Sequence, residues 1–126
     1  TDWVHAALTG SKNIQVLTDV LFSPLSMETL VEMIELVIQY KPIGVYNLGS
    51  KKGMSKADFD FEFAESLGLP THRMIGIPSS EASFLHAYRP KDMRMDCSKF
   101  EKLLGIKLPT LRDEIKRSAG EYYEKI

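Results

Sequence analysis

Apolar and polar positions along the chain predict helices separated by short strands. Residues 1–8 have the apolar spacing of an amphipathic helix, and 27–39 is apolar nearly all round, with a polar stripe of three glutamates and a glutamine. A helix so apolar must be covered on several sides. In the helix expected after position 55, Phe59 and Phe63 share a face, whereas Phe61 points about 200° away from Phe59. Phe61 therefore contacts either a partner outside this chain or a loop of the chain itself.

Short apolar runs bounded by turn residues predict strands at 14–17, 44–48 and 73–77. Helices are expected to begin at residues whose hydroxyl accepts a hydrogen bond from the first turn. These residues are Ser26, Ser55, Ser98 and Thr110. The last three have an acid three positions later, which is the capping-box spacing. Helix ends are expected at Lys41-Pro42, Gly68 and Gly105. This order predicts a mixed α/β fold that is predominantly helical.

Composition narrows the class of protein. At 126 residues the chain is long enough for one domain, and 44% apolar residues supply a core. Sixteen Lys and Arg against seventeen Asp and Glu give a formal net charge of −1, which argues against nucleic acid as a partner. Glutamates interrupt the apolar runs and no secretory signal is present, so we expect no membrane partner. A single cysteine, Cys97, favours a reducing compartment, and we expect a cytoplasmic protein.

Familiar catalytic patterns are missing from the sequence. The loop 49–53 leads into a helix, as phosphate-binding loops do, but it lacks both the dinucleotide and the P-loop spacing. It is either a phosphate cradle or an ordinary glycine-rich turn. His5, His72 and His86 fall in no metal-ligand spacing, so no metal is expected. No nucleophile elbow occurs either. We therefore assign no catalytic and no metal-binding residue.

The loop Arg89-Pro90-Lys91-Asp92 precedes a predicted helix and combines positive charge with restraint. Proline fixes its own φ and holds Arg89 extended, so the arginine loses less entropy on binding. A guanidinium suits bidentate contact with phosphate, Lys91 and Arg94 add positive potential, and Asp92 can accept from a sugar hydroxyl. The alternative is a solvated loop whose arginines pair with nearby acids.

Three groups of residues in order resemble dTDP-4-dehydrorhamnose reductases of the extended short-chain dehydrogenase/reductase superfamily. The first is Phe22-Ser23-Pro24 with Glu28-Thr29-Leu30, and the second is 44–48 with Ser55 and Phe59. The third comprises Arg89-Pro90, Met95–Lys99, Leu103–Ile106 and Leu108-Pro109. Together they span nearly the whole chain.

The resemblance implies that 1–126 is a single domain, the C-terminal substrate-binding half of such a protein, lacking most of the Rossmann sheet. The N-terminal NAD(P)-binding half, with its glycine-rich loop and Tyr-x-x-x-Lys catalytic pair, would lie outside this chain. No tyrosine here is followed four positions later by lysine. We expect the fragment itself to bind no cofactor and transfer no hydride, and NADPH or NADH to bind the complete protein. The expected partners are a nucleotide-sugar and the missing Rossmann half, and an oligomer is compatible with this interpretation.

The same resemblance implies roles for particular residues. Arg89 would contact the diphosphate of the nucleotide-sugar, Asp92 would lie beside the nucleoside, and Lys91 would add positive charge. The implied function is nucleotide-sugar recognition in an NADP-dependent dTDP-4-dehydrorhamnose reductase-like enzyme of deoxysugar and polysaccharide biosynthesis.

The segment 16–22 would form the opposite wall of this site. Val16 and Leu17 are expected near the base, and Phe22 near the sugar. Phe22 and Leu25 stand where these reductases usually have glycine and threonine, which predicts a larger, more apolar wall and a changed sugar pocket.

Two other interpretations remain open from sequence. The regulatory β subunit of methionine adenosyltransferase is similar in fold and has a comparable Asp-Cys-Ser-Lys run, here 96–99. That similarity implies a non-catalytic interaction module, which an exposed Phe61 would suit. The other is an unrelated helical domain.

Overall fold

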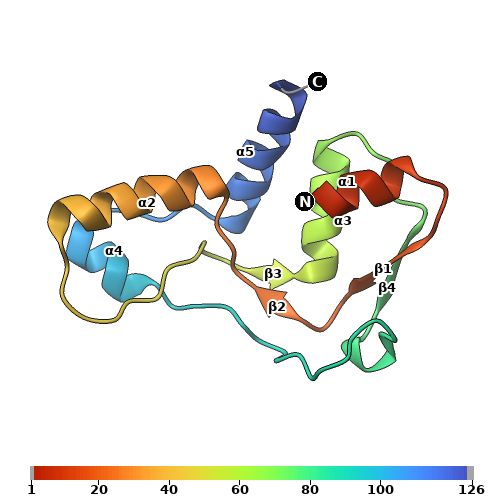
Figure 1. Ribbon diagram of the computed structural model, residues 1–126, viewed down its shortest axis with the longest axis horizontal. Coiled ribbons are helices and arrows are strands. Elements are labelled where there is room, and N and C mark those ends of the chain that lie inside the picture. Colours follow the sequence, from red (N-terminus) through yellow and green to blue (C-terminus); the bar gives the residue numbers. More distant parts are fainter. Residues whose placement is uncertain (1, 125–126) are drawn as a thin grey trace.

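The computed structural model describes residues 2–124 as helices joined by short strands and long extended segments (Figure 1). The α-helices are α1 (Asp2–Thr9), α2 (Met27–Tyr40), α3 (Lys56–Ser66), α4 (Ser98–Leu104) and α5 (Leu111–Glu124). The strands are β1 (Ile14–Leu17), β2 (Leu21–Phe22), β3 (Met54–Ser55) and β4 (Met74–Ile77), and η1 (Ser79–Glu81) is a 3₁₀ turn. This confirms a mixed α/β fold with few strands.

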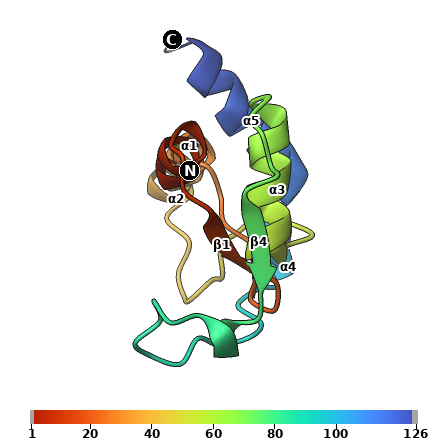
Figure 2. The ribbon, with the colours of Figure 1, turned by 90° about the vertical axis from the view of Figure 1, so that its right-hand side faces the viewer.

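The strands form two small sheets. β1 pairs in parallel with β4, from Ile14 opposite Met74 to Leu17 opposite Ile77. β2 pairs antiparallel with β3. Figure 2 shows β1 and β4 side by side with the same direction. Because both strands run the same way, their carboxyl ends meet at one edge, and the segments that follow them are brought together there.

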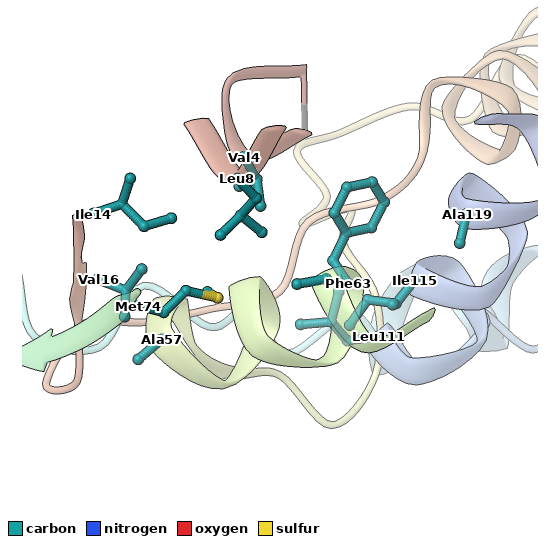
Figure 3. Close-up of a cluster of buried hydrophobic side chains, with 11 residues drawn as sticks. Val4, Leu8, Ile14, Val16, Ala57, Phe63, Met74, Leu111, Ile115 and Ala119 are labelled. Atoms are coloured by element: carbon teal, nitrogen blue, oxygen red, sulfur yellow. The ribbon is translucent and has the colours of Figure 1, made fainter. Parts of the chain in front are cut away.

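The largest core cluster lies between α1, α3, α5 and the β1–β4 sheet (Figure 3). Phe63 of α3 is fully buried and stacks on Phe59, with ring centroids 6.2 Å apart. This confirms the face predicted for these two aromatics. Phe61 is half-buried and packs against the same cluster. Of the two alternatives for Phe61, the structure therefore supports cover by the chain itself.

Three of the four predicted helix caps are confirmed. The Ser26 hydroxyl accepts a hydrogen bond from the Thr29 amide at 3.1 Å, and the Ser55 hydroxyl accepts from the Asp58 amide at 3.0 Å. The Asp58 carboxylate accepts from the Ser55 hydroxyl at 2.7 Å, but no bond from the Ser55 amide to Asp58 completes a reciprocal box among the residues described.

At the last helix Thr110 and Asp113 form the reciprocal pair, with both backbone-to-side-chain distances at 3.2 Å. Ser98 was predicted wrongly. It is the first residue of α4, and its amide donates to the Asp96 carboxylate at 2.9 Å. Asp96, two residues earlier, therefore supplies the cap, and the Ser98 hydrogen bonds lower the pKa of this carboxyl.

The strand predicted at 44–48 is also wrong, because this segment is irregular. A strand needs a neighbouring edge for its N–H and C=O groups, and no other segment within 2–124 forms a ladder with it. Gly44 has a φ of 119°, and Ile43 and Val45 are 94% and 87% exposed. An apolar sequence suited to a strand is thus left without a partner.

The expectation that residues 27–39 are covered on several sides is wrong for the part of the chain described. Thr29 is the one fully buried residue of α2, while Met33 and Val37 pack against a cluster around Phe100. Met27 and Ile38 remain 74% and 66% exposed. Most of the apolar surface of this helix faces outward. None of the helices described has the length and apolar character needed to cross a bilayer.

Candidate nucleotide-sugar site

Two polar residues meet where the parallel strands end. Asp19 follows β1 and Ser79 follows β4, and the Thr18 amide donates to the Ile77 carbonyl at 3.0 Å. The Asp19 carboxylate accepts from the Ser79 amide at 2.8 Å and from its hydroxyl at 3.1 Å. In sheets of parallel strands, ligands bind just beyond the carboxyl ends. This edge is therefore where a site is expected.

The loop predicted as a diphosphate clamp is attached to the same edge. The Lys91 ammonium contacts both the Asp19 carboxylate and the Ser79 hydroxyl. On the backbone, the Leu21 amide donates to the Lys91 carbonyl at 2.8 Å, and the Met93 amide donates to the Leu21 carbonyl at 2.9 Å. The Lys91 hydrogen bond is the main cause of the lowered pKa of Asp19. Lys91 thus holds the loop in place, with its charge already paired.

Asp92 is also paired. Arg94 donates to its two carboxylate oxygens at 2.9 and 2.7 Å, and the Arg94 amide adds a bond of 3.1 Å. These bonds lower the pKa of Asp92 to about 2. Asp92 is therefore ionised and held by its neighbour, so it has less capacity to accept from a sugar hydroxyl.

Arg89 differs from its neighbours. Its side chain is exposed and makes no ion pair or hydrogen bond with any residue described. It lines a cavity of about 520 Å³ at the edge where β1 and β4 end. The other lining residues are Ser79, Ser80, Ala82, Leu85, His86, Ala87, Tyr88 and Lys91. The structure thus places one unpaired guanidinium at the mouth of a cavity with polar and aromatic walls.

The residues expected on the opposite wall lie elsewhere. Val16 is 1% exposed and belongs to the main core, while Leu17 is 6% exposed and packs beneath the cavity. Phe22 is half-buried, 5.3 Å from the Phe59 ring and beneath the Lys56 ammonium. The structure brings Arg89 and Lys91 together but does not bring these three side chains into the same cavity.

Sequence reasoning missed Asp19 and Ser79, although a signal was present. Each lies two residues after a predicted strand, and the carboxyl ends of neighbouring parallel strands meet at one edge. That pairing of strands was not predicted, so the two residues were not connected.

We predict that Asp19→Asn loosens the clamp loop. Without its ion pair to Lys91 the loop should open more often, although solvent screening keeps the effect small. Hydrogen exchange at the Leu21 and Met93 amides should become up to about fivefold faster, while Glu65→Gln, on an exposed face of α3, should leave it unchanged. Unaltered exchange in Asp19→Asn would show that the backbone bonds alone hold the loop.

The loop 49–53 is a structural turn. The Ser50 amide donates to the Ser23 carbonyl at 2.9 Å, and the Lys51 amide donates to the Pro109 carbonyl at 2.8 Å. A Cβ at Gly49 would lie 2.6 Å from the Ser23 carbonyl oxygen, so only glycine allows this approach. The Ser50 and Lys51 amides are therefore already used within the fold. Within residues 2–124 no three His, Cys, Asp or Glu side chains gather as a metal site.

Comparison with known proteins agrees with the fold and with the sequence resemblance. Residues 3–124 match the model of the RmlD substrate binding domain. The chain belongs to this family. No curated protein matches the sequence.

Solved structures share the fold at low sequence identity. The dTDP-4-dehydrorhamnose reductase of Bacillus anthracis, solved with NADP, superimposes with a TM-score of 0.83 at 19% identity over 92% of this chain. The reductase of Yersinia enterocolitica gives 0.80 at 21% identity over 94% of this chain. In both cases this chain spans 41% of the reductase. UDP-glucose 4-epimerase of Bifidobacterium longum, solved with NAD+ and UDP, gives 0.68 at 24% identity over 98% of this chain and 39% of its own.

Proposed function

We propose that this chain is the nucleotide-sugar-binding portion of a dTDP-4-dehydrorhamnose reductase-like enzyme. The observation that carries the proposal is the unpaired Arg89 at the cavity beyond the carboxyl ends of β1 and β4. Membership of the substrate-binding domain family supports the same ligand class. Lys91 and Arg94 are already paired with Asp19 and Asp92. The positive charge available for a diphosphate is therefore that of Arg89.

The arrangement divides the work between two basic residues. The Arg89 guanidinium binds the diphosphate with two parallel hydrogen bonds. Lys91, paired with Asp19, positions the loop instead of contacting phosphate. The rings of His86 and Tyr88, which line the cavity, are available for stacking on a nucleobase. A cavity of about 520 Å³ suits part of a nucleotide-sugar.

In the complete enzyme the substrate is a dTDP-linked 6-deoxy-4-keto sugar, and NADPH supplies the hydride for its C4 carbonyl. This chain contributes recognition and orientation, which convert the hydride transfer into a reaction between positioned groups. The cofactor and the catalytic pair belong to the Rossmann half of the protein. The exposed Met27 and Ile38 of α2, with Ile43 and Val45 after it, form the surface on which that half docks.

An interaction module without catalysis is the less supported alternative. It drew on an exposed Phe61, and Phe61 is half-buried against the chain's own core. The unpaired Arg89 at a cavity supports ligand binding.

The clamp is tested by Arg89→Ala. We expect the dissociation constant for dTDP to rise tenfold or more, because hydrogen bonds to charged groups contribute about 1.5 to 3 kcal/mol. The measurement is a backbone-amide NMR titration of the 126-residue chain with dTDP, with UDP as a control for the base. Shifts are expected at residues 79–93.

Arg112→Ala is the matched control, because Arg112 is exposed and pairs with Glu62 on another part of the surface. It should leave dTDP affinity unchanged. Equal affinity in Arg89→Ala and the unaltered chain would remove Arg89 from the site. An unaltered chain that shows no shifts with millimolar dTDP would contradict an independent site in this half.

A further inference from the structure

A second cavity, of about 510 Å³, lies between α1, the segment 22–27, α3 and α5. It shares no lining residue with the cavity at Arg89. The helices that surround it also form the main core, and Figures 1 and 3 show α1, α3 and α5 converging in this region. The proposed diphosphate and nucleobase contacts do not use this space, although Phe22 and Met27, assigned above to the sugar wall and to the docking surface, also line it.

Asp60 of α3 is the unusual residue of the cavity. It is 6% exposed, lines the cavity, and has no hydrogen-bond partner among residues 2–124. Burial raises the pKa of this carboxyl to about 6, although nearby positive charges, including that of Lys56, oppose the effect. Buried carboxylates are normally hydrogen-bonded or paired, because an unpaired one is destabilising. This one is left for something that enters the cavity.

The charges around Asp60 are mostly of the same sign. Glu114 and Glu121 of α5 and Asp2 of α1 also line the cavity, against one positive residue, Lys56. Glu114 is satisfied, since it accepts from the Thr29 hydroxyl at 2.7 Å and from the Ser26 amide. Glu121 has one carboxylate oxygen that is buried without a hydrogen-bond partner. Asp60 thus retains acceptor capacity, whereas the Glu121 side chain shares a hydrogen bond with Glu28.

The remaining walls are largely aromatic. They are provided by Trp3, Phe22, Phe59 and Tyr122. Lys56 already lies over one of these rings, with its ammonium 5.4 Å from the Phe22 centroid. Aromatic faces attract cations and also pack against the apolar body of a ligand. The cavity therefore combines acceptors for a positive group with a wall for hydrocarbon.

These features select among ligand classes. An anion would meet four carboxylates and one lysine, and a neutral ligand would leave the Asp60 charge unpaired. A metal ion lacks a cluster of three or more ligands within the residues described. An ammonium group can donate to Asp60 while its apolar substituent lies on the aromatic wall. We propose that this cavity binds a small protonated organic amine, with Asp60 as its principal counter-ion.

The test is a titration of the 126-residue chain with benzylamine, followed by backbone-amide NMR, with benzyl alcohol and phenylacetate as matched neutral and anionic probes. Benzylamine should shift residues that line the cavity, with a dissociation constant at least tenfold lower than that of either control. Equal binding of benzyl alcohol, or no shifts at millimolar benzylamine, would overturn the proposal.

Asp60→Asn should weaken benzylamine binding at least tenfold, because one unit of charge is removed with little change in volume. Glu65→Gln removes the same charge from an exposed position of the same helix and should have no effect. A dispersed amide spectrum of each variant establishes that it is folded. Undiminished binding in folded Asp60→Asn would refute the role of Asp60.

The affinity for benzylamine should also decrease as the pH is lowered. As pH decreases from about 7.5 to about 5, Asp60 takes up a proton and no longer attracts an ammonium. Among residues 2–124, the charged groups that line the cavity with this carboxyl are Lys56 on its own helix, Glu114 and Glu121 on α5, and Asp2 on α1. The decrease should be absent in Asp60→Asn, and its persistence there would assign it to another group. Because the two cavities are separate, none of these outcomes depends on dTDP binding.

Discussion

Replacing Phe63 by alanine is expected to lower the free energy of unfolding by about 3 to 5 kcal/mol. Phe63 is 0% exposed, stacks on Phe59 and meets the Tyr122 ring edge-on at 5.7 Å. Its ring joins α3 to α5 in the main cluster (Figure 3). Truncation would remove the buried ring and leave a cavity that three separate elements would have to fill. The measurement is urea denaturation followed by circular dichroism.

Phe84→Ala is the matched control, because Phe84 is 50% exposed. Its effect should stay within about 0.5 kcal/mol. The loss of unfolding free energy in Phe63→Leu should lie between those of Phe63→Ala and Phe84→Ala. This variant keeps the comparison measurable if Phe63→Ala does not fold. Similar losses for Phe63→Ala and Phe84→Ala would show that the core is not organised around Phe63.

Asp60→Asn is expected to have the opposite effect and to stabilise the protein by about 2 to 3 kcal/mol at neutral pH. In the folded state the pKa of Asp60 is about 6, above its ordinary 3.8. The folded state therefore holds the proton more tightly, and its stability is highest below the unfolded pKa. That stability is lost as pH rises through the folded pKa. Asparagine does not titrate and does not carry this penalty.

The pH dependence is the diagnostic part of this prediction. The difference in free energy of unfolding between the variant and the unaltered chain should be small near pH 4. It should increase between about pH 4 and pH 6 and stay constant at higher pH. Urea denaturation across this range measures it. For Glu65→Gln the difference in free energy of unfolding should not increase with pH. A difference that does not change with pH would mean that the Asp60 carboxyl is solvated or paired in the folded protein.

The two roles of Asp60 are linked. A buried charge that lowers stability is retained when it serves a function, and replacing it trades function for stability. We therefore expect Asp60→Asn to be more stable at neutral pH and weaker in amine binding. If Asp60→Asn were more stable and bound the amine as well as the unaltered chain, the Asp60 charge would not contribute to amine binding.

The loop that contains Arg89 could be identified from sequence, but the ion pairs within the site could not. The Arg89 loop was identified because proline restrains a basic segment, and Arg89 does line a cavity. Lys91 and Asp92 were assigned to the ligand, whereas they pair with Asp19 and Arg94. Lys91 and Asp19 are far apart in the chain, so their pairing depends on how β1, β4 and the loop meet. Local patterns contain no information on such a contact.

The sequence by itself determined the class of fold, two of the three predicted strands, three helix caps and the aromatic face of α3, because each depends on neighbours within one or two turns. Only the tertiary structure decided what depends on distant partners. Residues 44–48 have the composition of a strand but no edge to pair with, and α2 has the apolarity of a core helix but stays largely uncovered. Asp60 reads as an ordinary helical acid in sequence, and only the packing of α1 and α5 against α3 encloses it. The burial of a side chain and its ion pairs depend on the folded chain, because elements far apart in sequence exclude water from each other's surfaces only when they pack together.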